Sequence, residues 1–172
     1  MSYQTVLSSI GPSVLEESNG LYLLKEPVSL DALVAITCGL LEQRFMRSDY
    51  ITGPSSIKDY LRARLSIQER EIFACVFLDA QHGVLSYEEL FFGTVNGTTV
   101  HPREVVKRAL TLNACAAICS HNHPSGQPEP SMADREITKR LRDALELVNV
   151  RLLDHIVVGG ALTYSFAEHG LM

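Results

Sequence analysis

Hydrophobic residues recur along the chain with two different spacings, and together they predict strands alternating with helices. The run EIFACVFLD at 71–79 is apolar and rich in β-branched and aromatic residues, and VLSYEELFFGTV after the turn AQHG is its expected hairpin partner. CAAICSH at 115–121 predicts a further buried strand. VRLLDHIVVGG at 150–160 and LTYSFAE at 162–168 predict the closing strands.

Two segments between these strands have the spacing of amphipathic helices. HPREVVKRALTLNA begins with Pro102 at a favourable first helical position and places these apolar residues on one face: Val105, Val106, Ala109, Leu110 and Leu112. SMADREITKRLRDALELVN repeats apolar residues at intervals of three and four: Ile137, Leu141, Leu145 and Val148. Strands with helices between them predict an α/β or α+β domain.

The first 50 residues have a less regular pattern. SLDALVAITCGLLEQRFM predicts one helix in this region. Just beyond it, the turn Gly53-Pro54 leads into SSIKDYLRARL, which predicts a short second helix. The candidate N-caps are Ser29 or Asp31 for the first helix and Ser55 or Ser56 for the second. We therefore expect an accessory helical segment at about 1–50 and a main domain at about 51–172.

Composition and charge narrow the class of protein. Of 172 residues, 46% are hydrophobic and 20% are charged, as in ordinary globular proteins. The net charge of −5 argues against a dedicated nucleic-acid binder, although it leaves room for a local basic patch. No apolar run approaches the roughly 20 residues of a membrane-spanning helix, and the N-terminus does not resemble a signal peptide. We expect a cytoplasmic protein, with a homo-oligomer left open.

Four cysteines occur, at Cys38, Cys75, Cys115 and Cys119, and none forms a C-x-x-C pair. A disulfide framework is not expected without a secretion signal. Cys115 and Cys119 lie in the apolar run ACAAIC, so both are expected to be small buried side chains.

The segment CSHNHPSGQPEPSMAD carries the strongest chemical signal. Residues i and i+2 of a strand project to the same side, so His121 and His123 can point together while Asn122 points away. A turn stiffened by proline and glycine then leads to a helix that starts near Ser131, with Asp134 in its first turn. Two imidazoles, one carboxylate and an open fourth position are typical of a catalytic zinc site.

Other interpretations account for less of this pattern. Ser131 and Asp134 alone resemble a helix-capping box, but capping leaves the neighbouring H-x-H unexplained. A site of the metallo-β-lactamase type needs H-x-H-x-D-H, and Ser125 stands in the aspartate position. The amidohydrolase H-x-H belongs to a barrel of typically about 250 residues, and HNH nucleases spread their three residues along a ββα unit.

The complete pattern resembles that of a metalloprotease family. His121-x-His123, seven residues, Ser131, two residues and Asp134 resemble the H-x-H-x7-S-x2-D motif of the JAMM (MPN+) family. From Ile51 to Met172, the segments GTVNGTTVHPREVVKRAL, HNHPSGQPEPSMAD, LLDHIVVGG and YSFAEHGLM are similar to its RadC-like branch. Longer RadC proteins carry an N-terminal helix-hairpin-helix-type region whose glycine signature is missing here, so the chain resembles the shorter, prophage-type members.

The resemblance implies both a fold and an activity. The fold is a JAMM/MPN-type, cytidine-deaminase-like mixed β-sheet flanked by helices, and the activity is that of a zinc-dependent peptidase or isopeptidase. In the family the two histidines and the aspartate bind Zn2+, which points to His121, His123 and Asp134 as ligands. The family's serine, here Ser131, hydrogen-bonds the tetrahedral intermediate. The expected partner is an unidentified peptide or protein substrate.

Three glutamates compete for the role of catalytic base. In the family this residue precedes an apolar strand early in the fold, and Glu71 at the head of EIFACVFLD matches that context. Glu69, two residues earlier, and Glu104, close to a further histidine, remain alternatives. His155 is expected to be a structural or supporting histidine and not a metal ligand.

A second class of function stays open at this point. The RadC name is associated with DNA repair, so a JAMM-fold binding module for DNA or mobile-element maintenance, with little peptidase activity, is the alternative. The acidic charge argues against it. The intact ligand set also argues against it, because scaffolding members of the family usually lose their ligands.

Overall fold

The computed structural model describes residues 15–18, 21–47, 54–93 and 99–172. The chain divides into two compact units, Met1–Arg44 and Phe45–Met172. Each unit is described by itself below.

The first unit contains a short hairpin and the start of a long helix. Strands β1 (Leu15–Ser18) and β2 (Leu21–Leu24) pair antiparallel, and helix α2 spans Leu30–Arg47. The hydroxyl of Ser29 accepts the Ala32 N–H at 3.2 Å, so Ser29 caps the predicted helix. The hydrophobic pattern did not predict the hairpin, although the sequence has Asn-Gly between its strands, a strong signal for a tight hairpin turn.

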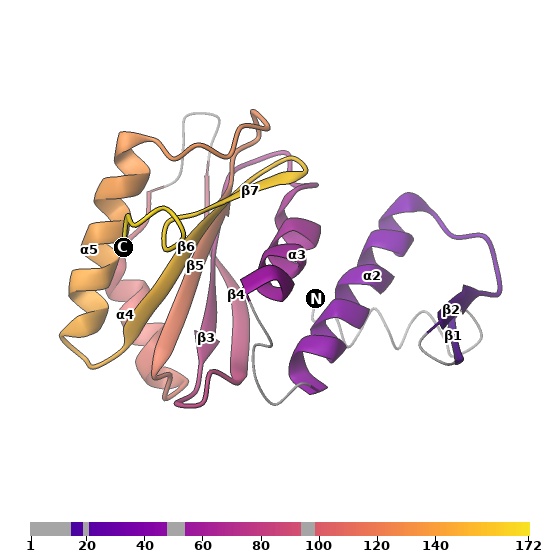
Figure 1. Ribbon diagram of the computed structural model, residues 1–172, viewed down its shortest axis with the longest axis horizontal. Helices are drawn as coiled ribbons and strands as arrows, with labels where there is room; N and C mark the ends of the chain where they lie inside the picture. Colours follow the sequence, from indigo (N-terminus) through magenta and orange to yellow (C-terminus); the bar gives the residue numbers. More distant parts are fainter. Residues whose placement is uncertain (1–14, 19–20, 48–53, 94–98) are drawn as a thin grey trace. The chain divides into compact units, whose positions relative to one another are not determined.

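The second unit is a single sheet with helices on both faces (Figure 1). Its elements are α3 (Pro54–Leu65), β3 (Ile72–Leu78), β4 (Val84–Phe92), α4 (Pro102–Thr111), β5 (Ala116–Asn122), α5 (Met132–Glu146), β6 (Arg151–Gly159) and β7 (Leu162–Ser165). The strand order is β4-β3-β5-β6-β7. Strands β5 and β6 run parallel and the other neighbours antiparallel. This arrangement confirms the predicted mixed sheet flanked by helices.

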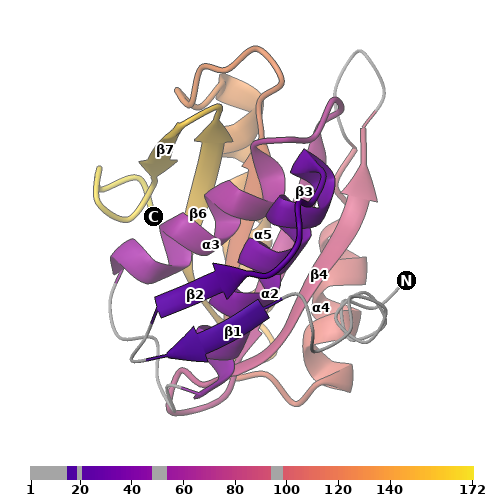
Figure 2. The same cartoon turned by 90° about the vertical axis from the view of Figure 1, so that its right-hand side faces the viewer.

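Helices α4 and α5 cover one face of the sheet and α3 covers the other, as the view turned by a quarter shows (Figure 2). Strands β3 and β5 are therefore buried along their whole length, because both of their faces are covered. This explains why β3 is apolar throughout and β5 is apolar as far as Cys119.

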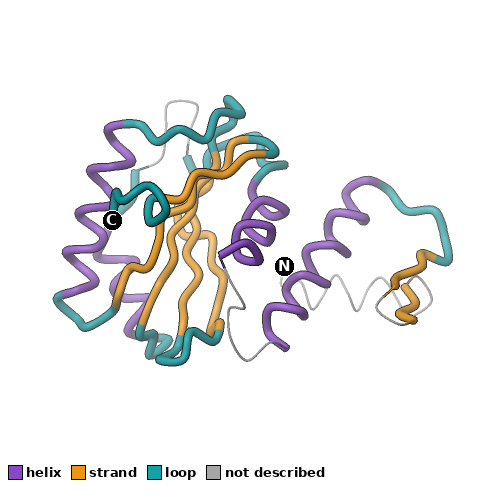
Figure 3. The backbone as a smooth tube through the Cα atoms, in the orientation of Figure 1, coloured by secondary structure: helices purple, strands orange, loops and turns teal. Residues whose placement is uncertain are grey.

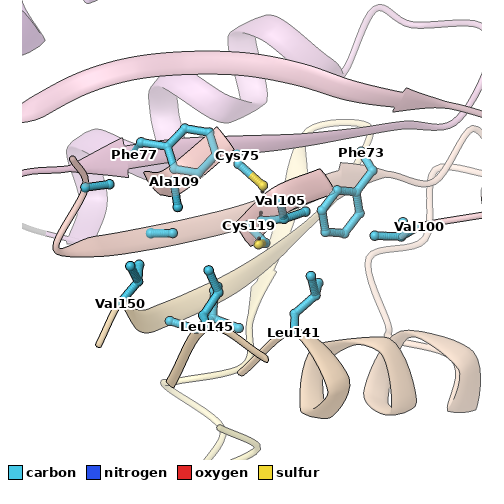
Figure 4. Close-up of a cluster of buried hydrophobic side chains, with 13 residues drawn as sticks. Phe73, Cys75, Phe77, Val100, Val105, Ala109, Cys119, Leu141, Leu145 and Val150 are labelled. Atoms are coloured by element: carbon cyan, nitrogen blue, oxygen red, sulfur yellow. Dashed lines mark hydrogen bonds between the residues drawn. The ribbon is translucent and has the colours of Figure 1, made fainter. Parts of the chain in front are cut away.

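The main core lies between the sheet and the helices α4 and α5 (Figure 4). Phe73 and Phe77 of β3 and Cys119 of β5 meet Leu141 and Leu145 of α5 there. All five side chains are at most 2% exposed. The apolar spacing of the α5 sequence thus correctly identified the face that packs on the sheet.

Three local predictions are wrong. Cys115 is exposed, because it precedes β5 and lines a surface pocket with Glu146 and Arg151. Leu110 is 52% exposed, because it is one helical position past the buried Ala109 and turns away from the core. Helix α3 begins at Pro54, so Ser55 and Ser56 lie within its first turn and neither is the N-cap.

Within the part of the chain that the structure describes, none of the helices has the length and apolar character needed to cross a lipid bilayer. The loop that joins β5 to α5 crosses one end of the sheet (Figure 3). It carries the turn that the sequence predicted between the histidines and the helix.

Candidate metal centre

The two histidines of the H-x-H motif meet at the end of β5. Their Nε2 atoms are 2.9 Å apart. His121 is the last but one residue of the strand and is 1% exposed, whereas His123 follows the strand and is partly exposed. The Asn122 side chain bonds instead to the backbone that enters β3, on the opposite side. The alternation expected of a strand therefore holds through this motif.

The loop after His123 turns back over the end of the sheet. Gly126 has φ +82°, a conformation that glycine adopts without strain. Gly159, at the end of β6, lies directly beneath the loop, where a Cβ atom would be 2.4 Å from the backbone nitrogen of Pro128. Only glycine at this position lets the loop lie so close to the sheet, and this approach brings the start of α5 to the histidines.

Asp134 reaches both imidazoles from the first turn of α5. Its Oδ1 is 3.2 Å from His121 Nε2, and its Oδ2 is 3.5 Å from His123 Nε2. The three residues each offer one ligand atom, and these atoms all lie within 4.8 Å of one another. Asp134 also completes a capping box with Ser131, so the capping interpretation of this pair is confirmed and is compatible with a further role at the site.

The protonation of His123 follows from its hydrogen bond to the loop. Its Nδ1 is 2.8 Å from the backbone oxygen of Gln127. A carbonyl oxygen only accepts, so Nδ1 carries the proton and the neutral ring has a lone pair on Nε2. This lone pair points toward His121 Nε2 and the Asp134 carboxylate.

A buried network continues behind His121. Its Nδ1 lies 2.8 Å from His155 Nε2, and His155 Nδ1 lies 2.6 Å from the Thr138 hydroxyl. The His155 ring stacks on Phe166 and meets Phe73 edge to face. Burial lowers the pKa of His155 well below its usual value, so the imidazole is neutral near pH 7. His155 thus contacts the candidate ligand His121 from behind, a structural position like the one that the sequence predicted.

The carboxylate is held in its charged form. Burial raises the pKa of Asp134, but its close contacts with the His121 and His123 imidazoles outweigh burial, so the pKa lies well below its usual range. In turn, the contact with the Asp134 carboxylate raises the pKa of His123, because the negative charge favours the protonated ring. An ionised carboxylate and two imidazole nitrogens are therefore directed at one point.

This set of donors fits a divalent metal ion. Two neutral imidazole nitrogens and one carboxylate oxygen match a three-ligand zinc site with one open position. Nitrogen and oxygen donors also suit other first-row transition metals. The structure therefore brings together a candidate metal site at His121, His123 and Asp134.

Ser131 is exposed at the rim of the site and is bonded to Asp134 in both directions. Its hydroxyl donates to Asp134 Oδ2 at 2.6 Å and accepts the Asp134 N–H at 3.2 Å. For Ser131 to donate to a substrate oxygen, its hydroxyl proton has to turn away from the carboxylate. Rotation about a single bond at an exposed position permits this.

Glu71 lies next to the histidines, at the entrance to β3. The β3–β5 ladder pairs Phe73 with His121, and the same register extended by two residues sets Glu71 opposite His123. The charge of Glu71 also helps to raise the pKa of His123. Glu69 is exposed in the bend before β3, and Glu104 is exposed on α4, 3.4 Å from Arg103. Glu71 as the catalytic base stays a prediction.

Sequence reasoning missed two residues that support the site. Thr138 lies four residues after Asp134 and contacts His155 from the buried face of α5. Asn122 bonds to the backbone of Gln68, Arg70 and Ile72, and so fixes the segment that carries Glu71. The threonine could have been noticed as a polar residue in the i+4 position from a ligand, on the side of the helix that packs on the sheet.

Comparison with known proteins places the chain among a family of bacterial proteins. Residues 51–171 match the RadC-like JAB domain. A UPF0758 protein of Stutzerimonas stutzeri (strain A1501) is 53% identical over 132 residues, which are 77% of this chain and 59% of that protein. A UPF0758 protein of Vibrio cholerae serotype O1 is 50% identical over 149 residues, 87% of this chain and 94% of that protein.

A UPF0758 protein of Nitrosococcus oceani is 56% identical over 132 residues, again 77% of this chain and 59% of that protein. The match thus spans about three fifths of the length of the Stutzerimonas and Nitrosococcus relatives. It spans nearly all of the Vibrio relative.

Proposed function

The chain belongs to the RadC-like JAB domain family, and on that premise we propose that it is a zinc-dependent hydrolase that cleaves peptide or isopeptide bonds. The observation that carries the proposal is the convergence of His121, His123 and Asp134, whose ligand atoms lie within 4.8 Å of one another. Their donor types suit zinc, and the resemblance to JAMM metalloproteases supplies the expected class of bond.

The chain's own residues divide the chemistry among them. A zinc ion in such a site lowers the pKa of a bound water to about 7, which makes a nucleophile available at neutral pH. Glu71 would act as the base that takes a proton from the attacking water and passes it to the leaving amine. Ser131 turns its hydroxyl from Asp134 toward the developing oxyanion, and losing such a donor typically costs on the order of 100-fold in rate.

The proposed zinc site is tested by measuring the zinc content of the purified protein. The purified full chain is expected to bind about one zinc ion, as typical of single catalytic sites, and Asp134→Ala is expected to lose it because one of three protein ligands is gone. Elemental analysis after dialysis gives the stoichiometry. Stoichiometric zinc in Asp134→Ala would contradict the ligand assignment, and none in the native chain would contradict the proposed cofactor.

The hydrolase activity is tested by mass spectrometry of new N-termini in a bacterial lysate treated with the zinc-loaded protein. Glu71→Gln keeps the size of the side chain and removes the base, so we expect cleavage to fall by about 100-fold or more. Glu69→Gln and Glu104→Gln are the matched controls and should retain activity. Equal cleavage by Glu71→Gln and the native chain would exclude Glu71 as the base. If neither the native chain nor any variant produced new N-termini, the result would argue against a peptidase.

A further inference from the structure

The buried network behind His121 contains one proton donor whose direction is fixed by its neighbours. The Thr138 hydroxyl lies 2.5 Å from the backbone oxygen of Asp134 and 2.6 Å from His155 Nδ1. A carbonyl oxygen has no proton to give, so the single hydroxyl proton of Thr138 lies between these two oxygens. Toward His155, the hydroxyl can then act only as an acceptor.

This direction propagates through His155 to the candidate ligand. His155 Nδ1 must carry a proton to donate to Thr138, and the neutral ring then has a lone pair on Nε2. That lone pair accepts the Nδ1–H of His121, 2.8 Å away. With its proton on Nδ1, His121 has a free lone pair on Nε2, the atom that faces His123 and Asp134.

The opposite direction would disable the site. If the Thr138 hydroxyl donated to His155, then His155 Nε2 would donate to His121 Nδ1, and the neutral His121 would carry its proton on Nε2. A protonated nitrogen cannot bind a metal ion. The choice between the two states depends on one hydroxyl group that touches none of the three candidate ligand side chains.

We propose that Thr138 and His155 are positioning residues of the metal site, which hold the proton of His121 on Nδ1 and so present its Nε2 to the metal ion. This inference rests on the proposed metal-binding function. It assigns a purpose to two buried polar residues in the core, where polar groups are retained only with partners. It also explains why Thr138 is 2% exposed and His155 is 0% exposed beside apolar and aromatic side chains.

The arrangement resembles a general feature of metal sites in proteins. A ligating histidine usually donates its other ring N–H to a carboxylate or carbonyl, which fixes its tautomer and orientation. His123 follows this rule through the Gln127 carbonyl. His121 has an imidazole in that place, which can donate or accept, so its tautomer depends on the next residue in the chain of hydrogen bonds, Thr138.

The test uses the full chain with Thr138→Val, which keeps the branched shape and removes the hydroxyl, and Thr138→Ser, which restores it. Thr111→Val is the matched control, because Thr111 also donates to a carbonyl four residues earlier, Lys107 at 2.9 Å, but is exposed on α4. Zinc affinity is measured by competition with a chromophoric chelator. We expect Thr138→Val to bind zinc about 10-fold more weakly, within the range for such supporting residues, and the other two variants to match the native chain.

A second measurement reports the tautomer without metal or activity. In long-range ¹H–¹⁵N spectra of the metal-free native chain, both His121 and His155 should be protonated on Nδ1, and Thr138→Val should weaken this preference. Protonation of His121 on Nε2 in the native chain overturns the proposal, even if Thr138→Val does not fold. Equal zinc affinity of Thr138→Val and Thr111→Val also overturns it. If the native chain binds no zinc, the proposed function fails, and the spectra still decide the proton positions.

Discussion

Both faces of β5 are polar at its carboxyl end, but their side chains have different partners. The side chains of one face contact one another, whereas those of the other face bond to the backbone. On one face, His121 and His123 direct two ring nitrogens toward the same point as the Asp134 carboxylate. Atoms with lone pairs alone repel at this distance unless a cation or a proton lies between them. A proton or a metal ion between these atoms would therefore stabilise this face.

On the other face, each polar side chain is satisfied by backbone. Ser120 donates to the Ile156 carbonyl at 2.7 Å. Asn122 accepts the Ile72 N–H at 2.8 Å and donates to the Arg70 carbonyl at 3.0 Å. One strand thus carries a candidate metal site on one face and structural hydrogen bonds on the other, and burial alone does not distinguish the two.

The largest effect is expected from removing a ligand on the first face. His123→Ala should weaken zinc binding by more than the roughly 100-fold that supporting residues can cause. It should change the free energy of unfolding of the metal-free chain by less than about 1 kcal/mol, because the side chain is partly exposed. Zinc titration and urea denaturation measure the two quantities. A large loss of stability without loss of zinc affinity would show that this face serves folding and not metal binding.

Asn122→Ala, one residue away, should have the opposite effect: it should lower stability and leave zinc affinity unchanged. It removes hydrogen bonds to three backbone groups and leaves the buried Ile72 N–H without this acceptor. We expect the free energy of unfolding to fall by about 3 kcal/mol, with zinc affinity retained by the folded protein. Urea denaturation in the presence of a chelator measures the free energy of unfolding of the metal-free chain. A change below about 0.5 kcal/mol would show that this face is not structural.

The smallest effect is expected at an ion pair away from β5, between Arg108 of α4 and Glu88 of β4. The Arg108 guanidinium bonds to both carboxylate oxygens of Glu88 and lowers its pKa below the usual 4.5. A carboxyl with a depressed pKa stabilises the fold above its unfolded pKa and loses this contribution as pH falls through its folded pKa. Arg108→Met should therefore lower the melting temperature at pH 7, and this difference should shrink below about pH 4.5.

Arg103→Met is the control for this experiment, because its side chain is 86% exposed in its contact with Glu104. Solvent screening makes such exposed pairs contribute little. Its melting temperature should stay close to that of the native chain at both pH values. A constant difference between Arg108→Met and the native chain from pH 7 to pH 3 would show that Arg108 acts through packing and not through the charge of Glu88.

Much of the fold was predictable because the hydrophobic pattern reflects the layers directly. IFACVFL and AAIC are continuously apolar because helices cover both faces of the sheet. Side-chain exposure at the ends of elements was harder to predict. Cys115 continues an apolar run but lies just before the strand, and Leu110 extends an apolar stripe past the edge of the contact between α4 and the sheet.

The residues of the candidate site also fall into two groups, those predictable from the local sequence and those brought together only by tertiary packing. His121, His123 and Asp134 were predictable because strand alternation, a rigid turn and a helix start are local features of the sequence. Thr138, His155 and Gly159 come from two different elements, and their meeting depends on the parallel pairing of β5 with β6 and on the packing of α5 against β6. Hydrogen bonds between distant segments leave no periodic signal.

The sequence by itself thus determined which side chains have the chemistry to bind a metal ion, and that they lie on a strand end and a helix start. Only the tertiary structure decided which nitrogen of each histidine faces the others. That decision depends on the Gln127 carbonyl for His123 and on the His155–Thr138 pair for His121. Hydrogen-bond direction is a property of atoms brought together by folding, and this is why residue types and spacing alone could not supply it.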